Sequence, residues 1–172
     1  METENSIYFY SHTSSNYKYM SNFYPCTFYE YEPYNTIQFN CTEQYLMYQK
    51  AKLFEPINID LQNNILRESS PSIIKKIGRR IKNYDDNIWS QIRYDIMLKG
   101  LRLKFAQNSI ISQELLKTYP KILYEASKND KIWGIGFDSN EGIRTDKTKY
   151  GTNLLGKALM QIRDEIMTNS TK

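Results

Sequence analysis

The sequence predicts a predominantly α-helical α+β fold in a single domain, with its strands confined to a small sheet and hairpins. Apolar residues recur at helical spacing over residues 42–54, 86–106 and 153–166. Alternating or aromatic runs typical of strands are short and lie at 6–10, 27–39 and 121–126. One domain over residues 1–172, with a core over about 7–166, is long enough to bury roughly two-thirds of its unfolded surface.

Composition and charge are those of an ordinary soluble protein. The formal charge of +4 permits a ligand that carries phosphate without requiring a nucleic-acid polymer. Cys26 and Cys41 form no C-x-x-C or Cys/His cluster, so neither a zinc site, a disulfide framework nor a cofactor is expected. A targeting segment and an apolar run of membrane-spanning length are not apparent, which favours a cytoplasmic location without membrane contact.

The first elements are strands. Residues 6–10 form a short aromatic strand, and a polar stretch leads to S-N-F-Y-P at 21–25, where proline stops regular pairing. Residues 27–31 and 36–39 alternate on either side of Pro33-Tyr34-Asn35, which predicts a β-hairpin. This hairpin leads directly to Thr42, the expected cap of the next helix.

The helix over 42–54 carries the first candidate chemistry. Glu43 in its first turn and Lys50 seven positions later lie on one face, with Cα atoms about 10 Å apart along the axis. Aromatic and apolar neighbours predict that the helix is mostly buried. Glu43, near the positive end of the helix, suits proton acceptance, and burial of Lys50 favours either a nucleophilic amine or a fixed cation.

Further helices follow. Pro56 ends the helix, residues 58–68 are moderately amphipathic, and Ser70-Pro71 begins a helix that reaches Gly78. The basic run over residues 75–82 has two interpretations. The favoured one is a solvated helix face, and the alternative is that Arg79 binds a phosphate. Asp85 or Asp86 caps a long helix to 105 or 106, which we expect to be central.

The last third of the chain combines a helix, a strand and polar loops. A helix is expected to begin at Ser109 or Ser112, and the alternating pattern over residues 121–126 predicts a strand. The polar stretch over residues 137–150 predicts a long loop, a candidate lid or binding loop, and the final helix is expected to begin at residues 151–153. Trp133, beside Asp130 and Gly134, is interpreted as a stacking wall for a nucleobase, whereas Trp89 on a helical face is interpreted first as core. Glu125, at the end of the strand, is a secondary candidate.

Several short sequence motifs follow one another along the chain: S-N-F-Y at 21–24, E-Q-Y-L-M-Y-Q-K-A at 43–51, G-R at 78–79, Trp89 with Arg93, K-F at 104–105, E-A-S-x-x-D-x-x-W-G-x-G at 125–136, and N-L-L-G-x-A-L-M-x-x-R at 153–163. Together they resemble the NADAR superfamily, also called YbiA-like, from about residue 7 to residue 163. The resemblance implies the same mainly helical α+β domain and cleavage of N-glycosidic bonds without a metal.

The resemblance also implies two substrate classes that share a ribose joined to a base nitrogen. These are phosphoribosylated pyrimidine intermediates of riboflavin synthesis, and ADP-ribose on guanine bases of nucleic acid, which would bring transient contact with ADP-ribosylated nucleic acid; no obligate protein partner is expected. The implied catalytic residues are Glu43, Lys50 and Asp130. The implied substrate-binding residues are Ser21, Asn22, Phe23, Arg79, Trp89, Glu125, Trp133 and Gly134.

Three points stay open at this level. Gln44 stands where many members have histidine, so a mechanism that uses that histidine cannot operate here. Lys50 acts either as electrostatic support or as a nucleophile that gives a ring-opened Schiff base. The alternatives to an enzyme are a module that binds ADP-ribose or a related nucleotide without hydrolysis, and a weak binder of single-stranded nucleic acid through the basic run and the tyrosines.

Overall fold

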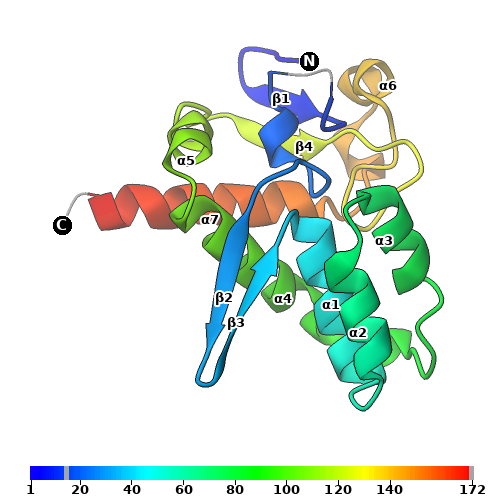
Figure 1. Cartoon of the computed structure of the whole chain (residues 1–172). Helices are drawn as coiled ribbons and strands as arrows, with labels where there is room; N and C mark the ends of the chain where they lie inside the picture. Colours follow the sequence, from blue (N-terminus) through cyan, green and yellow to red (C-terminus); the bar gives the residue numbers. More distant parts are fainter. Residues whose placement is uncertain (14–15, 171–172) are drawn as a thin grey trace. The chain divides into compact units, whose positions relative to one another are not determined.

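The computed structural model describes residues 1–13 and 16–170, which form two compact units (Figure 1). One unit consists of Met1–Ser21 and Ser109–Lys172, and the other of Asn22–Asn108. The expectation of a single domain therefore stays a prediction, and each unit is described by itself. The mixture of many helices with short strands confirms the predicted α+β class.

The unit Asn22–Asn108 begins with the expected hairpin. Strand β2 (Phe28–Glu32) pairs antiparallel with β3 (Asn35–Phe39), with Phe28 opposite Phe39 and Glu32 opposite Asn35. The Phe28 and Phe39 rings stack with centroids 5.6 Å apart, and both side chains are buried. Cross-strand aromatic pairs of this kind hold the register of a hairpin, which here delivers the chain to the first long helix.

Helix α1 (Thr42–Phe54) is buried along most of its length, as predicted. The expected cap at Thr42 is wrong by one residue: Cys41 is the N-cap, with extended backbone, and its side chain makes no capping hydrogen bond. Thr42 is instead the first helical residue. The backbone N–H of Glu43 donates to the carbonyl oxygen of Asn22 at 3.0 Å, so main chain satisfies a donor that a side-chain cap usually serves.

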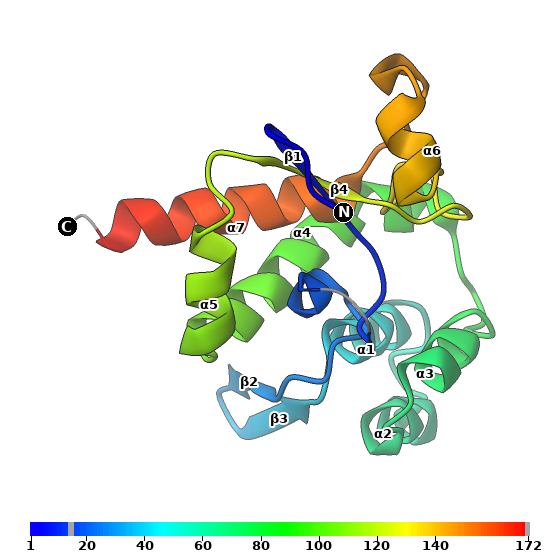
Figure 2. The same cartoon turned by 90° about the horizontal axis from the view of Figure 1, so that it is seen from above.

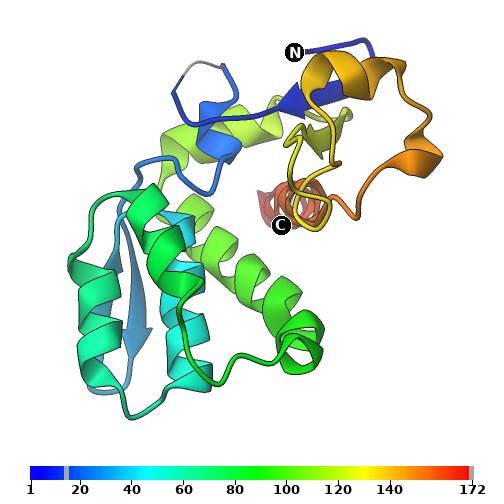
Figure 3. The same ribbon diagram turned by 90° about the vertical axis from the view of Figure 1, so that its right-hand side faces the viewer.

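Three more helices surround α1 in this unit. They are α2 (Ile59–Arg67), α3 (Pro71–Gly78) and α4 (Asp86–Ala106), and each contacts α1 (Figures 1 and 3). Asn58 and Asp85 cap α2 and α4 with side-chain oxygens, as their sequence positions indicate. A Cβ at Gly78 would lie 1.9 Å from the Met47 sulfur, so glycine is what lets α3 approach α1 this closely.

The other unit holds a parallel strand pair. Strand β1 (Ser6–Phe9) pairs with β4 (Ile122–Glu125) from Ser6 opposite Ile122 to Phe9 opposite Glu125. Helix α7 (Leu154–Ser170) packs against β4 and against α5 (Ser109–Leu116), as Figure 2 shows. The short 3-10 helix η1 (Lys18–Met20) precedes the boundary of the unit.

The stretch 137–150, expected to be an irregular loop, is more ordered than predicted. It contains helix α6 (Ser139–Arg144) and the 3-10 helix η2 (Lys147–Lys149). Asp138 accepts hydrogen bonds from the backbone N–H groups of Asn140 and Glu141, and Asp146 accepts one from Thr148. Capping by aspartate starts helices too short to show an apolar period, so periodicity missed them.

Helix α4 contains a buried lysine. Lys104 is fully buried, and burial lowers its pKa to about 8, although its ammonium lies over the rings of Tyr24 and Phe105.

In residues 1–13 and 16–170, no helix combines the length and the apolar character needed to cross a membrane.

Candidate active site

Glu43 and Lys50 share one face of α1, as their spacing predicts. The Glu43 side chain is only 5% exposed in the first turn of the helix. Burial lowers the pKa of Lys50, and the negative charge of Glu43 partly offsets that lowering. Glu43 lies at the positive end of the helix, a position that suits a carboxylate to accept a proton or to stabilise a developing positive charge.

Lys50 lies among aromatic rings. Its Nζ is 3.9 Å from the centroid of the Tyr84 ring and 5.9 Å from that of Trp89, and it donates to the carbonyl oxygen of Gly78 at 3.1 Å. Burial lowers the pKa of Lys50 below its ordinary value, while the charges of Glu43 and Asp86 oppose that shift. The amine is therefore easier to deprotonate than a surface lysine.

Trp89 is 5% exposed on α4 and packs near Phe54, with centroids 6.4 Å apart. Phe54 in turn meets Tyr84 edge-on at 5.3 Å. The core interpretation of Trp89 is thus correct, and its distance from Lys50 also makes it a wall of the site. The rings of Tyr84 and Trp89 lie near the Lys50 ammonium, and Phe54 contacts both rings; these three side chains are called the aromatic box.

Asn22 and Phe23 belong to the same unit. Asn22 is 8% exposed, and within the described residues its buried side-chain oxygen has no hydrogen-bond partner. The Lys75 ammonium lies 5.6 Å from the centroid of the half-buried Phe23 ring, which brings the start of this unit to the basic helix α3.

Arg79 follows the last residue of α3 and is exposed, as is Arg80. Among the described residues neither guanidinium has an ion-pair partner. Arg79 adjoins Gly78, whose carbonyl oxygen accepts the hydrogen bond from Lys50. An exposed cation next to the residue that fixes Lys50 is compatible with phosphate contact, which stays a prediction.

Gln44 has a structural task. Its Oε1 accepts from the backbone N–H of Asn40 at 2.8 Å, and its Nε2 donates to the carbonyl oxygens of Ile65, Leu66 and Glu68 at 2.9, 3.1 and 3.0 Å. The amide therefore connects α1 to the end of α2 and to the chain that follows it. These bonds use both its donor and its acceptor sides and leave no proton-transfer role for this side chain.

Four of the expected site residues lie in a turn and a strand of the other unit. Asp130 Oδ1 accepts from the backbone N–H groups of Ile132 and Trp133 at 2.9 and 2.8 Å, which shapes the turn that carries Trp133. Trp133 is half-buried, and Glu125 ends β4. A Cβ at Gly134 would lie 2.8 Å from the Glu125 carbonyl oxygen, so the glycine serves a close backbone approach.

Ser21 lies at the boundary of the same unit, where its N–H closes η1 by donating to the Lys18 carbonyl oxygen at 3.1 Å. The structure thus brings together Glu43, Lys50, Trp89, Asn22, Phe23 and Arg79 in one unit. The other unit holds Ser21, Glu125, Asp130, Trp133 and Gly134.

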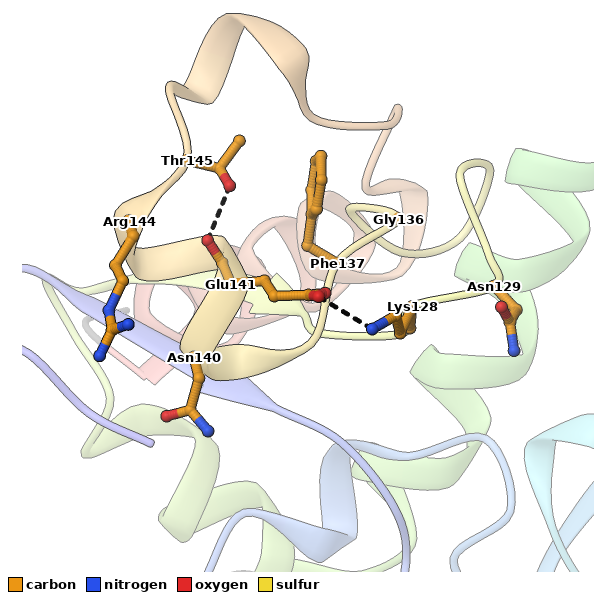
Figure 4. Close-up of a pocket in the computed structure, with 8 residues that line it drawn as sticks. All are labelled: Lys128, Asn129, Gly136, Phe137, Asn140, Glu141, Arg144 and Thr145. Atoms are coloured by element: carbon orange, nitrogen blue, oxygen red, sulfur yellow. Dashed lines mark hydrogen bonds and ion pairs between the residues drawn. The ribbon is translucent and has the colours of Figure 1, made fainter.

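A pocket of about 650 Å³ in the latter unit was not predicted. Lys128, Phe137, Glu141 and Arg144 line it, with the Lys128 ammonium held by the Glu141 carboxylate at 2.8 Å (Figure 4). None of the expected catalytic residues is part of its lining. The described residues contain no group of three or more His, Cys, Asp or Glu side chains placed to hold a metal ion.

Tyr84 and Arg93 were not selected from the sequence as site residues. Arg93 follows Trp89 by four positions and so shares its helical face, a signal that periodicity offered. Tyr84 lies between α3 and α4, where no period applies. Its proximity to Lys50 joins segments far apart in the chain, so nothing local to Tyr84 predicts it.

Comparison with known proteins identifies the family. The family model of the NADAR domain matches residues 8–167. The chain belongs to the NADAR domain family. N-glycosidase R617 of Acanthamoeba polyphaga mimivirus is 37% identical over 169 residues, which cover 96% of this chain and 98% of the relative. The match to the NADAR domain extends over most of both units, and it confirms the family resemblance that the sequence motifs indicated.

Two other NADAR relatives bear on fold and activity. The NMR structure of the E. coli protein YbiA superposes with a TM-score of 0.77 at 27% identity, covering 100% of this chain and 90% of that one. Riboflavin biosynthesis protein VVA0006 of Vibrio vulnificus is 29% identical over 167 residues, 97% of this chain and 40% of the relative. The name of the viral relative confirms the expected class of enzyme, a hydrolase that acts on N-glycosyl compounds.

Proposed function

We propose that this protein hydrolyses the bond between a base nitrogen and a phosphorylated ribose, with Glu43 and Lys50 as its reacting groups. The observation that carries the proposal is the pair itself: a buried carboxylate at the start of α1 and an ammonium of lowered pKa on the same face, inside the aromatic box. Membership of the NADAR family, whose relatives include N-glycosidases, supports this reaction class.

The chemistry requires both kinds of group. As the bond breaks, positive charge develops at the anomeric carbon and negative charge on the departing base. Glu43 stabilises the positive charge and accepts a proton from the attacking water, whose oxygen bonds to the anomeric carbon. The base leaves with its bonding electron pair and takes up a proton from solvent, to which Glu43 returns the proton that it accepted. The Lys50 ammonium stabilises the leaving base or the ribosyl phosphate.

The second route for Lys50 is covalent. Its neutral amine attacks the anomeric carbon, the base departs, and a ring-opened imine forms that water then hydrolyses to release the sugar. Burial, which lowers the pKa of Lys50, favours this route, whereas the Gly78 carbonyl and the Tyr84 ring favour the charged form. Borohydride separates the routes because it reduces an imine to a stable secondary amine, detected as a mass increase on Lys50 in wild type and absent from Lys50→Arg.

Two substrates are proposed for test. One is a ribosylamino-pyrimidine phosphate of riboflavin synthesis, which the name of the Vibrio relative supports, and the other is ADP-ribosyl-guanine, free or in nucleic acid. Release of free base from each is followed chromatographically, with Glu43→Gln as the inactive control. Binding of either compound without base release would contradict the enzyme and favour a nucleotide-binding module.

Trp133 is proposed separately as a surface on which an aromatic base stacks. The half-buried ring and the Asp130 turn that presents it support this role. Because Trp89 is the other tryptophan of the chain, fluorescence of Trp89→Phe reports on Trp133 alone. Quenching of that fluorescence by guanosine or a pyrimidine nucleotide is expected, and unchanged emission at saturating ligand contradicts the role.

A further inference from the structure

The aromatic box holds Lys50 in a defined orientation. The Lys50 Nζ lies 3.9 Å from the Tyr84 ring centroid and donates to the Gly78 carbonyl oxygen at 3.1 Å. A cation at this distance over a ring face is attracted by the negative face of the π-system. One N–H of the ammonium of this half-buried lysine is thus bonded to Gly78, and one side of the ammonium lies against the Tyr84 ring.

The Tyr84 ring is itself held at two points. Its hydroxyl donates to Asp86 Oδ1 at 2.5 Å, and its ring packs edge-to-face with the Phe54 ring at a centroid distance of 5.3 Å. Asp86 also lies 3.8 Å from the Arg93 guanidinium, whose side chain is largely covered. The ring is therefore braced from α4 and from the end of α1, although 42% of Tyr84 is exposed.

These contacts are not what core packing alone requires. A tyrosine that only filled space would place its hydroxyl in solvent and its ring against apolar side chains. Tyr84 instead places one ring face on the Lys50 ammonium and directs its hydroxyl to a carboxylate that is mostly exposed. The result is a chain of contacts that runs from Arg93 through Asp86 and Tyr84 to Lys50.

We propose that Tyr84 is the positioning residue for Lys50: its ring face holds the ammonium against the Gly78 carbonyl, and Asp86 fixes the ring through the hydroxyl. The proposal rests on the proposed function in that Lys50 is taken to act on the substrate. The placement of the Tyr84 ring over the Lys50 ammonium does not depend on that role, and it can be tested whether or not a substrate is known.

The geometry is tested by NMR of the whole chain labelled with 13C at the ε-carbon of lysine. Protons on the Lys50 ε-carbon are expected upfield of other lysines because of the Tyr84 ring current, and Lys50→Arg assigns the signal by its loss. Tyr84→Phe is expected to keep most of the upfield shift, and Tyr84→Leu to remove most of it, because the Trp89 ring lies further from the Lys50 Nζ, at 5.9 Å, than the Tyr84 ring at 3.9 Å. The matched control, Tyr34→Leu, changes a fully exposed tyrosine in the hairpin turn and is expected to leave the signal in place.

Asp86→Asn provides a variant that does not depend on the fate of Tyr84→Leu, since the Asp86 side chain is 69% exposed and the protein is expected to fold. Weakening the hydroxyl contact is expected to reduce the upfield shift partly. A Lys50 signal at the ordinary lysine position in wild type, or one unmoved by Tyr84→Leu, would overturn the proposed geometry.

The kinetic arm uses whichever of the two proposed substrates is turned over. Tyr84→Leu is expected to lower kcat by about tenfold to a hundredfold with little change in KM, because a misplaced ammonium loses stabilisation that is exerted mainly in the transition state. Tyr84→Phe is expected to recover most of kcat. An unchanged kcat in Tyr84→Leu overturns the positioning role. If neither substrate reacts, the proposed function fails while the NMR result still decides the arrangement of Tyr84 and Lys50.

Discussion

The side-chain amide of Gln44 in α1 donates to the carbonyl oxygen of Ile65 in α2 at 2.9 Å. Gln44→Leu keeps the size of the side chain but removes the acceptor of the Asn40 N–H and the donor to the Ile65 and Leu66 carbonyl oxygens, whereas the Glu68 carbonyl oxygen keeps its bond from Asn40 Nδ2. We expect a loss of about 2 kcal/mol or more in the free energy of unfolding, measured by urea denaturation. Gln38→Leu, at an exposed position of β3, is the control and should change this free energy by less than about 0.5 kcal/mol. Equal urea midpoints for the two variants would argue against this bracing role.

Lys104 predicts a pH dependence of stability. Burial lowers the pKa of Lys104 to about 8 in the folded protein, from the ordinary lysine value of 10.5 that applies in the unfolded chain. Below pH 8 the lysine is charged in both states, so the full cost of burying the charge destabilises the folded protein. Between pH 8 and 10.5 the unfolded state binds more protons, and stability rises with pH. Lys104→Met removes that cost, and we expect it to raise the free energy of unfolding at pH 7 by on the order of 3 kcal/mol.

The advantage of Lys104→Met over wild type should shrink as pH rises from 8 to 10.5. Urea denaturation at several pH values measures it, and Lys157→Met, at an exposed position of α7, serves as the control. A difference between Lys104→Met and wild type that is the same at pH 7 and at pH 10 would show that the buried ammonium is not the cause.

Glu43→Gln tests the carboxylate directly. The amide keeps the shape of the side chain but can neither accept the proton of water nor offset positive charge on the ribose. We expect kcat to fall by about a hundredfold to ten-thousandfold with the fold retained, as judged by circular dichroism. Glu68→Gln, outside α1, is the control for loss of a carboxylate in the same unit. Full activity in Glu43→Gln would remove this residue from the reaction.

Arg79→Gln tests the phosphate contact. We expect KM for the phosphorylated substrate to rise by about tenfold with kcat nearly unchanged, because a charge-assisted hydrogen bond is lost equally in ground and transition states. The neighbouring Arg80, which is also exposed, supplies the matched control, Arg80→Gln. For a substrate without phosphate, Arg79→Gln and wild type should give the same KM. A rise that is equal for both substrates would point to a general effect rather than a phosphate contact.

The sequence was sufficient for most elements and for part of the site. The hairpin before α1, the proline that begins α3 and the Asp85 cap of α4 were each predicted from local residues, because turns, caps and apolar periods depend on near neighbours. The shared face of Glu43 and Lys50 follows from the same periodicity. Helix α6 was missed because it is too short to display a period.

Only the tertiary structure decided what surrounds these residues. It placed Tyr84 over Lys50, gave Gln44 its four backbone partners and committed Asp130 Oδ1 to the turn before Trp133. Each of the first two contacts joins segments far apart in the chain, and the Asp130 turn depends on backbone angles that residue type alone does not fix. Local preferences set which residues share a helix face, whereas the packing of distant segments sets the charge, burial and orientation on which the proposed chemistry depends.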